Sequence, residues 1–170
     1  IADTKNHSIR AFNFKTKEIR TLAGDGSQGY ERSGKHKAQD ISLNSPWDLL
    51  MLGDTMYIAM AGPHQIWSMD MKKNYIGVFS GDGSEQNLNG KLLQSAFAQP
   101  SGLAHYKDKL YIADSESSSV RVIDLKEKLV STLAGGNQNP RDLFHFGDEQ
   151  GKGPGRRFQH LLDLTIINGL

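Results

Sequence analysis

The chain has 170 residues, of which 20 are basic and 19 acidic, and its net charge of +1 creates no overall field that would attract nucleic acid or a membrane surface. It contains no cysteine, which excludes disulfide frameworks and thiolate metal sites and fits a reducing compartment, so we expect a cytosolic protein. No apolar run is long enough to span a bilayer, and no membrane association is expected.

A repeated unit organises the chain. Ile1, Ile58 and Ile112 stand at equivalent positions, 57 and then 54 residues apart, which indicates an array of similar units. In chain order, the units cover residues 1–24, 46–81 and 100–135. The first unit starts in mid-strand and not at a methionine, so we expect an internal piece of a larger protein.

Each complete unit predicts four short strands separated by turn residues. The expected strands are 47–52, 55–59, 65–70 and 75–80 in the second unit, and 103–106, 110–114, 119–124 and 129–135 in the third. Their apolar residues are consecutive instead of alternating, which predicts sheets covered on both faces, as when four-stranded sheets stack radially. This pattern favours an all-β propeller over a sandwich.

Long connections separate the units. They cover residues 24–44, 81–99 and 136–160, the first two opening with Gly-Asp-Gly, and a short helical turn is expected at 91–96. Loops of this length without a role are uncommon, so they predict a rim surface for a protein partner. The candidate partner-binding residues are Arg32, Lys35, Lys37, Arg156, Arg157 and Phe158. Single-stranded RNA is an alternative ligand for them, although the balanced net charge makes nucleic acid binding unexpected.

The series from Pro100 through Gly102, Asp114 and Arg121, echoed at Asp3 and Arg10, resembles the NHL repeat, a β-propeller blade. In some members of this family a thioredoxin-like domain precedes a six-bladed propeller. The resemblance covers residues 1–160 and implies an open arc of two complete four-stranded blades flanked by partial ones. The stretch 161–170 departs from the pattern, and we expect a divergent or truncated start of the next blade.

The repeat predicts a cross-strand pair inside each blade. If Asn6 and His7 form the tip of a hairpin, Asp3 lies directly opposite Arg10 on one face of the sheet. The third unit carries the same charged residues, whereas the second unit has an apolar pair. The structural motif residues are therefore Asp3, Arg10, Pro46, Met60, Trp67, Pro100, Gly102, Asp114 and Arg121.

Catalytic and cofactor chemistry find little support in the sequence. Gly24, Gly26 and Gly29 spell a dinucleotide fingerprint, but no helix is expected to follow them to receive a pyrophosphate. The six histidines lack the spacing of a preformed metal site. We therefore assign no catalytic, cofactor or metal residues and expect a non-catalytic scaffold for protein interaction. The alternative is a propeller enzyme of the lyase or lactonase type, for which Asp48 and His105 would matter.

The open arc also predicts self-association of this chain. Its two ends would leave unpaired strand edges and uncovered apolar faces, which favour edge-to-edge association.

Overall fold

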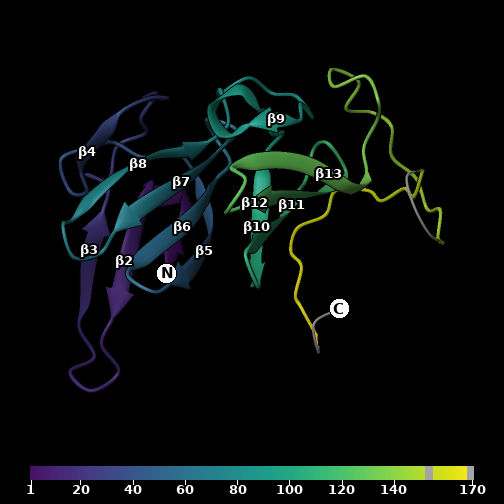
Figure 1. Ribbon diagram of the computed structural model, residues 1–170. Helices are drawn as coiled ribbons and strands as arrows, with labels where there is room; N and C mark the ends of the chain where they lie inside the picture. The colour runs from purple at the N-terminus through teal and green to yellow at the C-terminus, as the bar shows by residue number, and fades with distance from the viewer. Residues whose placement is uncertain (152–154, 168–170) are drawn as a thin grey trace.

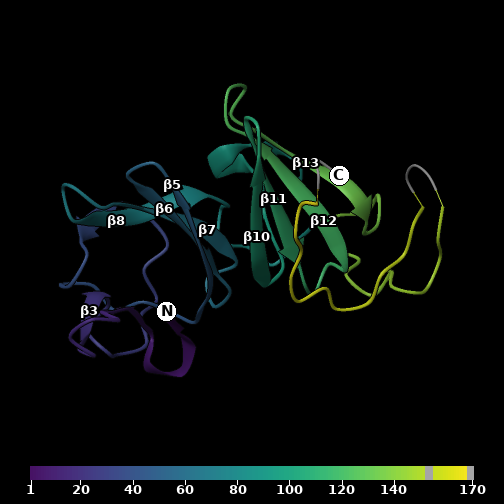
Figure 2. The same ribbon diagram turned by 90° about the horizontal axis from the view of Figure 1, so that it is seen from below.

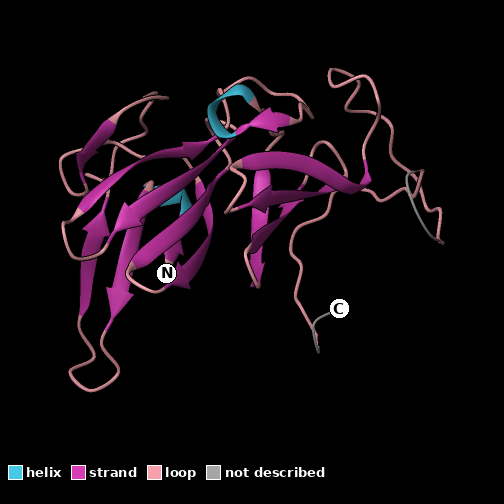
Figure 3. Cartoon of the chain, viewed as in Figure 1, coloured by secondary structure: helices cyan, strands magenta, loops and turns pink. Residues whose placement is uncertain are grey.

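The computed structural model describes residues 1–151 and 155–167 and contains three antiparallel sheets (Figure 1). The N-terminal sheet has the order β1-β2-β3, with β1 at Ala2–Asp3, β2 at Ser8–Phe12 and β3 at Ile19–Ala23. Three residues of the expected loop 136–160 and the last three of the expected stretch 161–170 lie outside the described residues. The secondary structure is almost entirely strand (Figure 3).

The middle and C-terminal sheets contain the two repeats that are complete. The middle sheet comprises β5 (Pro46–Leu52), β6 (Thr55–Met60), β7 (Gln65–Asp70) and β8 (Tyr75–Ser80). The C-terminal sheet comprises β10 (Pro100–Tyr106), β11 (Lys109–Asp114), β12 (Ser119–Asp124) and β13 (Leu129–Gly135). Viewed from below, the three sheets lie side by side along an open arc (Figure 2), and the all-β propeller fold is confirmed.

Each complete sheet has one strand more than the four expected. The connection before it adds a short outer strand: β4 (Lys35–Lys37) pairs with β8, and β9 (Gly90–Lys91) pairs with β13. Backbone groups at the outer edge thereby gain partners, which shortens the exposed edge. The expected helical turn is present as the 3-10 helix η2 (Leu92–Gln94). A second one, η1 (Thr4–Asn6), joins β1 to β2.

Two apolar clusters fill the spaces between the sheets. One face of the middle sheet, including Ile58 and Ile76, packs with Ile9 of the N-terminal sheet. Its other face, including Tyr57, packs with Ile112 of the C-terminal sheet. Both faces of the middle sheet are therefore buried, which explains the consecutive apolar residues in its strands.

The predicted hairpin register is wrong by two residues. The turn between β1 and β2 occupies residues 4–7, and Asp3 lies opposite Ser8 instead of Arg10. Likewise, Asp114 lies opposite Ser119, and Arg121 lies opposite Ile112. The cause is the turn, whose last residue adopts a left-handed conformation, with φ of 47° at His7. Asp3 and Arg10 therefore meet diagonally, on the same face of the sheet.

Candidate interaction surfaces

The charged pairs that the repeat predicts form in spite of the shifted register. Asp3 Oδ2 lies 3.0 Å from Arg10 Nε, and Asp114 Oδ2 lies 3.3 Å from Arg121 Nη1. The first pair is about 30% exposed, whereas the second is fully buried. Burial raises the pKa of Asp114 to about 6, although the nearby guanidinium opposes this shift.

The buried pair fastens the preceding connection to its blade. Arg121 donates hydrogen bonds to the carbonyl oxygens of Ala96 and Leu88, each at 2.9 Å, and its guanidinium lies 5.2 Å from the centroid of the Phe97 ring. Asp114 accepts a 2.8 Å hydrogen bond from the amide of Ala98. The pair thus satisfies backbone groups of the connection that would otherwise be buried without partners.

In the middle blade, apolar side chains hold the preceding connection against the sheet. Met60 and Trp67 are buried in the first cluster together with Ala38, Ile41 and Leu43 of the preceding connection. The Trp67 indole donates a 3.0 Å hydrogen bond to Gln65, a buried side chain that in turn donates a 3.1 Å hydrogen bond to the carbonyl oxygen of Arg32 in that connection. Charged and apolar pairs therefore have one role, which is to hold the connection against the blade.

A contact that the sequence reasoning missed links each blade to the next. His7 Nδ1 accepts a 3.1 Å hydrogen bond from the amide of Ser45, and His64 Nδ1 accepts one of 3.2 Å from the amide of Gln99. The Ser118 hydroxyl accepts one of 3.3 Å from the amide of His160. The sequence feature that could have indicated this contact is that His7 and His64 occupy the same position of the repeat.

The motif residues at the start of the inner strands are also structural. Pro46 and Pro100 begin β5 and β10, where a missing backbone donor is tolerated. At Gly102 an added Cβ would lie 2.6 Å from the Asp163 Cα, so only glycine allows segment 161–167 to approach β10 this closely.

Of the two residues considered for a channel enzyme, Asp48 makes contacts that join two strands. Asp48 accepts hydrogen bonds from the amides of Leu49 and Leu103, both at 2.7 Å, which ties β5 to β10. His105 lies half-buried on β10. In the part of the chain that the structure describes, no three His, Cys, Asp or Glu side chains are placed to hold a metal ion.

In the glycine-rich loop that begins at Gly24, backbone amides bond to carbonyl oxygens of the same connection. The amide of Gly24 donates to Ala38, and that of Gly29 donates to Leu43 at 2.7 Å. These amides are therefore occupied by backbone carbonyl oxygens. A phosphate-binding loop needs amides that point at the ligand, so this loop is a blade connection.

The candidate partner-binding residues lie at opposite ends of the arc. Lys35 and Lys37 are exposed on β4, which Figure 1 shows at the left, whereas Arg156 and Arg157 belong to the segment at the right. Arg157 forms a 3.5 Å ion pair with Glu149. The two basic sets do not form one face, which removes the main geometric support for an RNA-binding surface.

Two other candidates have structural contacts. Arg32 donates to the carbonyl oxygen of Gly83 and so joins the first two connections. Phe158 occupies the position that Leu43 and Phe97 hold in the earlier connections, and its carbonyl oxygen accepts a 3.0 Å hydrogen bond from Gly147 in the same way. Phe158 therefore closes the third connection.

A groove on the outer rim separates the middle and C-terminal blades. We call it the rim groove, and its volume is about 580 Å³. Its lining is Lys35, Ser68, Val78, Phe79, Lys91, Leu92, Leu93, Gln94, Glu127 and Lys128. Leu93 is 62% exposed at its edge. Three lysines and one glutamate surround an apolar floor, so the groove is suited to an acidic segment with apolar side chains.

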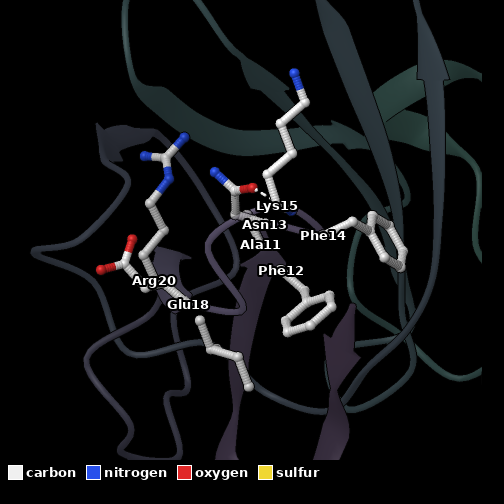
Figure 4. Close-up of a pocket in the computed structure, with 8 residues that line it drawn as sticks. Ala11, Phe12, Asn13, Phe14, Lys15, Glu18 and Arg20 are labelled. Carbon is white, nitrogen blue, oxygen red and sulfur yellow. Dashed lines mark hydrogen bonds between the residues drawn. The ribbon is translucent and has the colours of Figure 1, made fainter.

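A second hollow, of about 650 Å³, lies on the N-terminal sheet at the turn between β2 and β3. Figure 4 shows the rings of Phe12 and Phe14 beside it, and they meet edge to face at 5.1 Å between centroids. This hollow is open to solvent on one face of the sheet, and Ile19 on its lining is 63% exposed.

None of the helices in the described residues has the length and apolar composition needed to cross a membrane.

Comparisons with known proteins show relatives that are much longer. The chain is 44% identical over 174 residues to "Protein SUPPRESSOR OF QUENCHING 1, chloroplastic" from Arabidopsis thaliana, which matches 99% of the chain and 16% of that protein. It is 39% identical over 189 residues to NHL repeat-containing protein 2 from Homo sapiens, with 97% of the chain and 26% of that protein covered. No family model matches the chain.

Solved structures share the fold. A protein of unknown function from Bacteroides thetaiotaomicron superposes with a TM-score of 0.70 at 22% identity, over 95% of this chain and 37% of that one. An auxiliary nutrient binding protein from the same organism superposes with a TM-score of 0.66 at 17% identity, over 96% of this chain and 39% of that one.

Proposed function

Because the chain is an arc of an NHL-type β-propeller, we propose that it is a non-catalytic scaffold for protein–protein interaction and that its rim groove binds an acidic peptide segment with apolar side chains. The rim groove carries this proposal because it combines an apolar floor with an excess of positive charge at its rim. It also lies on the outer edge, where a partner can reach it in a complete propeller.

The contacts of the other polar candidates favour a scaffold over an enzyme. Both carboxylate oxygens of Asp48 and the carboxylate of Asp114 accept backbone hydrogen bonds within the protein. A carboxylate that accepts backbone hydrogen bonds has its orientation fixed by the protein and has fewer lone pairs left for a substrate proton or a metal ion. A metal-dependent lyase or lactonase is the alternative, and stoichiometric zinc or calcium in the purified protein would support it.

Selection from a phage-displayed library of short random peptides tests the rim groove. We expect enriched sequences that combine Asp or Glu with Leu, Phe or Met. Leu93→Glu and Lys91→Glu should abolish their binding, whereas Phe144→Glu, at a residue that is 83% exposed on the third connection, should not. Peptides that bind the Leu93→Glu variant as well as the unaltered chain would refute the assignment of the groove.

The expected cytosolic location stays a prediction. The name of one relative places that protein in the chloroplast.

A further inference from the structure

A hollow lies where the first connection passes the turn between β6 and β7, and we call it the aromatic pocket. Its volume is about 430 Å³. The first connection lines it with Gln28, Tyr30, Arg32 and Asn44, and the middle blade lines it with Trp47 and His64. Its walls therefore come from a connection and a blade that are both complete.

Trp47 departs from the repeat at a position where the strand bulges. In β5 and in β10 the pairing register shifts at the residue that follows the first proline, and such a bulge redirects the side chain of the extra residue. In β10 this residue is Ser101, which is 4% exposed and donates a 3.1 Å hydrogen bond to the carbonyl oxygen of Ala113. Trp47 is instead 40% exposed, and its indole N–H has no partner among the described residues. The indole is therefore available to a ligand.

Tyr30 supplies a second exposed ring, and it is 78% exposed. The residue before it, Gly29, donates a 2.7 Å hydrogen bond to the carbonyl oxygen of Leu43. A Cβ on Gly29 would overlap the carbonyl oxygen of Ser42, so the two parts of the connection lie in close contact here. The backbone that carries Tyr30 is thus held in place beside the pocket. Exposed Trp and Tyr rings on a fixed backbone are typical of a binding surface.

Asn44 is oriented as a hydrogen-bond donor. Its Oδ1 accepts a 3.1 Å hydrogen bond from the Ser45 hydroxyl and a 3.3 Å one from Gln28, whereas its Nδ2 has no partner in the described part of the chain. The side chain needs Gly62 beside it, because a Cβ added there would overlap the Asn44 amide. The protein therefore uses the oxygen of this amide and leaves its N–H groups for a ligand.

His64 supplies a neutral donor. Its Nδ1 accepts a 3.2 Å hydrogen bond from the amide of Gln99, so the proton of the neutral ring lies on Nε2. Burial lowers the pKa of His64, although Glu85 opposes this shift, and the ring is therefore neutral at pH 7. Glu85 and Glu116 both act on His64 electrostatically and offset the positive charge of Arg32. The pocket is therefore rich in donors and nearly neutral.

These donors and rings restrict the chemistry of the ligand. Trp47, Asn44 and His64 each have an N–H without a partner among the described residues, and the described lining contains no carboxylate. A ligand that suits them carries hydrogen-bond acceptors and apolar rings. Proline has this character, because its ring packs on an aromatic face and its backbone has a carbonyl oxygen but no N–H. A proline-rich segment also holds its extended conformation before binding, so it loses less conformational entropy.

We propose that the aromatic pocket binds a proline-rich segment of a partner protein in the polyproline II conformation. The rings of Trp47 and Tyr30 contact proline rings, and Asn44 Nδ2 donates to a carbonyl oxygen of the segment. A nucleic acid strand fits less well, because Glu85 and Glu116 repel its phosphates. The pocket shares no lining residue with the rim groove, so it is a second interaction surface that does not rest on the first.

Paired peptide libraries test the class of ligand. In the first library two prolines are fixed about three positions apart, which is one turn of polyproline II, and in the second library alanines replace them. We expect binders from the first library only. Enrichment from both libraries, or from neither, overturns the proposal.

Variants of the two rings test where the selected peptides bind. Tyr30→Ala and Trp47→Ala should each lose at least about tenfold in affinity, and Tyr30→Ala should keep its circular dichroism because the ring is exposed. Phe14→Ala removes a ring that is 79% exposed on another sheet and should bind like the unaltered chain. Unchanged binding by Tyr30→Ala and Trp47→Ala would show that the peptides do not use this pocket.

Tryptophan fluorescence locates the ligand independently of mutation. The chain has two tryptophans, of which Trp47 is 40% exposed and Trp67 is 1% exposed. Acrylamide should therefore quench Trp47 in preference to Trp67, and a selected peptide should protect it. Quenching that is unaltered at saturating peptide overturns the proposal. Protection by a single-stranded oligonucleotide, with none by the proline-rich peptide, would show that the ligand class is wrong.

Asn44→Asp tests the donor itself. The carboxylate can still accept from Ser45 and Gln28, but it has no N–H to offer a carbonyl oxygen, so the peptide should bind at least about tenfold more weakly. Equal affinity would remove Asn44 from the proposed contacts and overturn the argument from donors. Leu93→Glu, in the rim groove, should leave this peptide bound, so failure at one surface is measured separately from failure at the other.

Discussion

Replacing Asp114 with methionine would leave the Arg121 guanidinium without its counter-charge in a site closed to water. Both side chains are fully buried, and removing one member of such a pair costs about 3–5 kcal/mol. Adding Arg121→Trp removes the stranded charge and installs the Met and Trp that the middle blade carries at Met60 and Trp67. We expect the double variant to be more stable than Asp114→Met alone.

The gain is incomplete because Arg121 also donates to the carbonyl oxygens of Ala96 and Leu88. Each buried polar group left without a partner costs about 1–3 kcal/mol, so the double variant should stay less stable than the unaltered chain. Urea unfolding at pH 7.5, followed by circular dichroism at one protein concentration, measures the free energies of unfolding.

Asp3→Met is the matched control, because Asp3 occupies the equivalent position in a pair that solvent screens. It should lose much less stability than Asp114→Met. If the double variant is the less stable of the two, or if Asp3→Met costs as much as Asp114→Met, the buried pair does not have the role assigned to it.

Three further predictions concern pH and the approach of strands. Burial raises the pKa of Asp114 from 3.8 to about 6, so the folded state binds this proton more tightly than the unfolded chain does. The contribution of Asp114 to stability should therefore fall as pH rises from about 4 to 6. If the urea midpoint of Asp114→Asn had the same pH dependence as that of the unaltered chain, the prediction would be wrong. Burial lowers the pKa of His64 below 6.5, so stability should decrease as pH falls below about 6.5. His64→Ala should lose this pH dependence and also about 1 kcal/mol of stability from the hydrogen bond to Gln99. An unchanged thermal melt of the variant would count against this prediction. Gly102→Ala places a Cβ 2.6 Å from a backbone atom of segment 161–167, so amide hydrogen exchange in that segment should become faster. Unaltered exchange would show that the segment does not need this close approach to β10.

Much of the fold is local and periodic, and the sequence alone determined it. The repeat of 57 and then 54 residues defined the blades, and turn residues marked most strands within a few positions. The contact between Asp114 and Arg121 could also be predicted, because both members change together to an apolar pair in the middle blade. Such covariation between copies reports a contact directly.

The hairpin register and the outer strands needed the tertiary structure. The register depends on a turn whose last residue has a left-handed conformation. His7, His64 and Ser118 occupy this position, and because none of them is glycine, the sequence does not indicate the conformation. The outer strands β4 and β9 form only because the connections fold back onto neighbouring edges. Their pairing partners lie far along the chain, and local propensity does not specify them.

Exposure was decided by neighbouring sheets. Ile19 and Ile76 are the same residue at the same position of the repeat, yet Ile19 is 63% exposed and Ile76 is fully buried. The sequence determined that both prefer an apolar environment, but only packing against an adjacent blade removes the side chain from water. Burial is a property of the assembled arc, because the hydrophobic effect acts on the surface that neighbours cover.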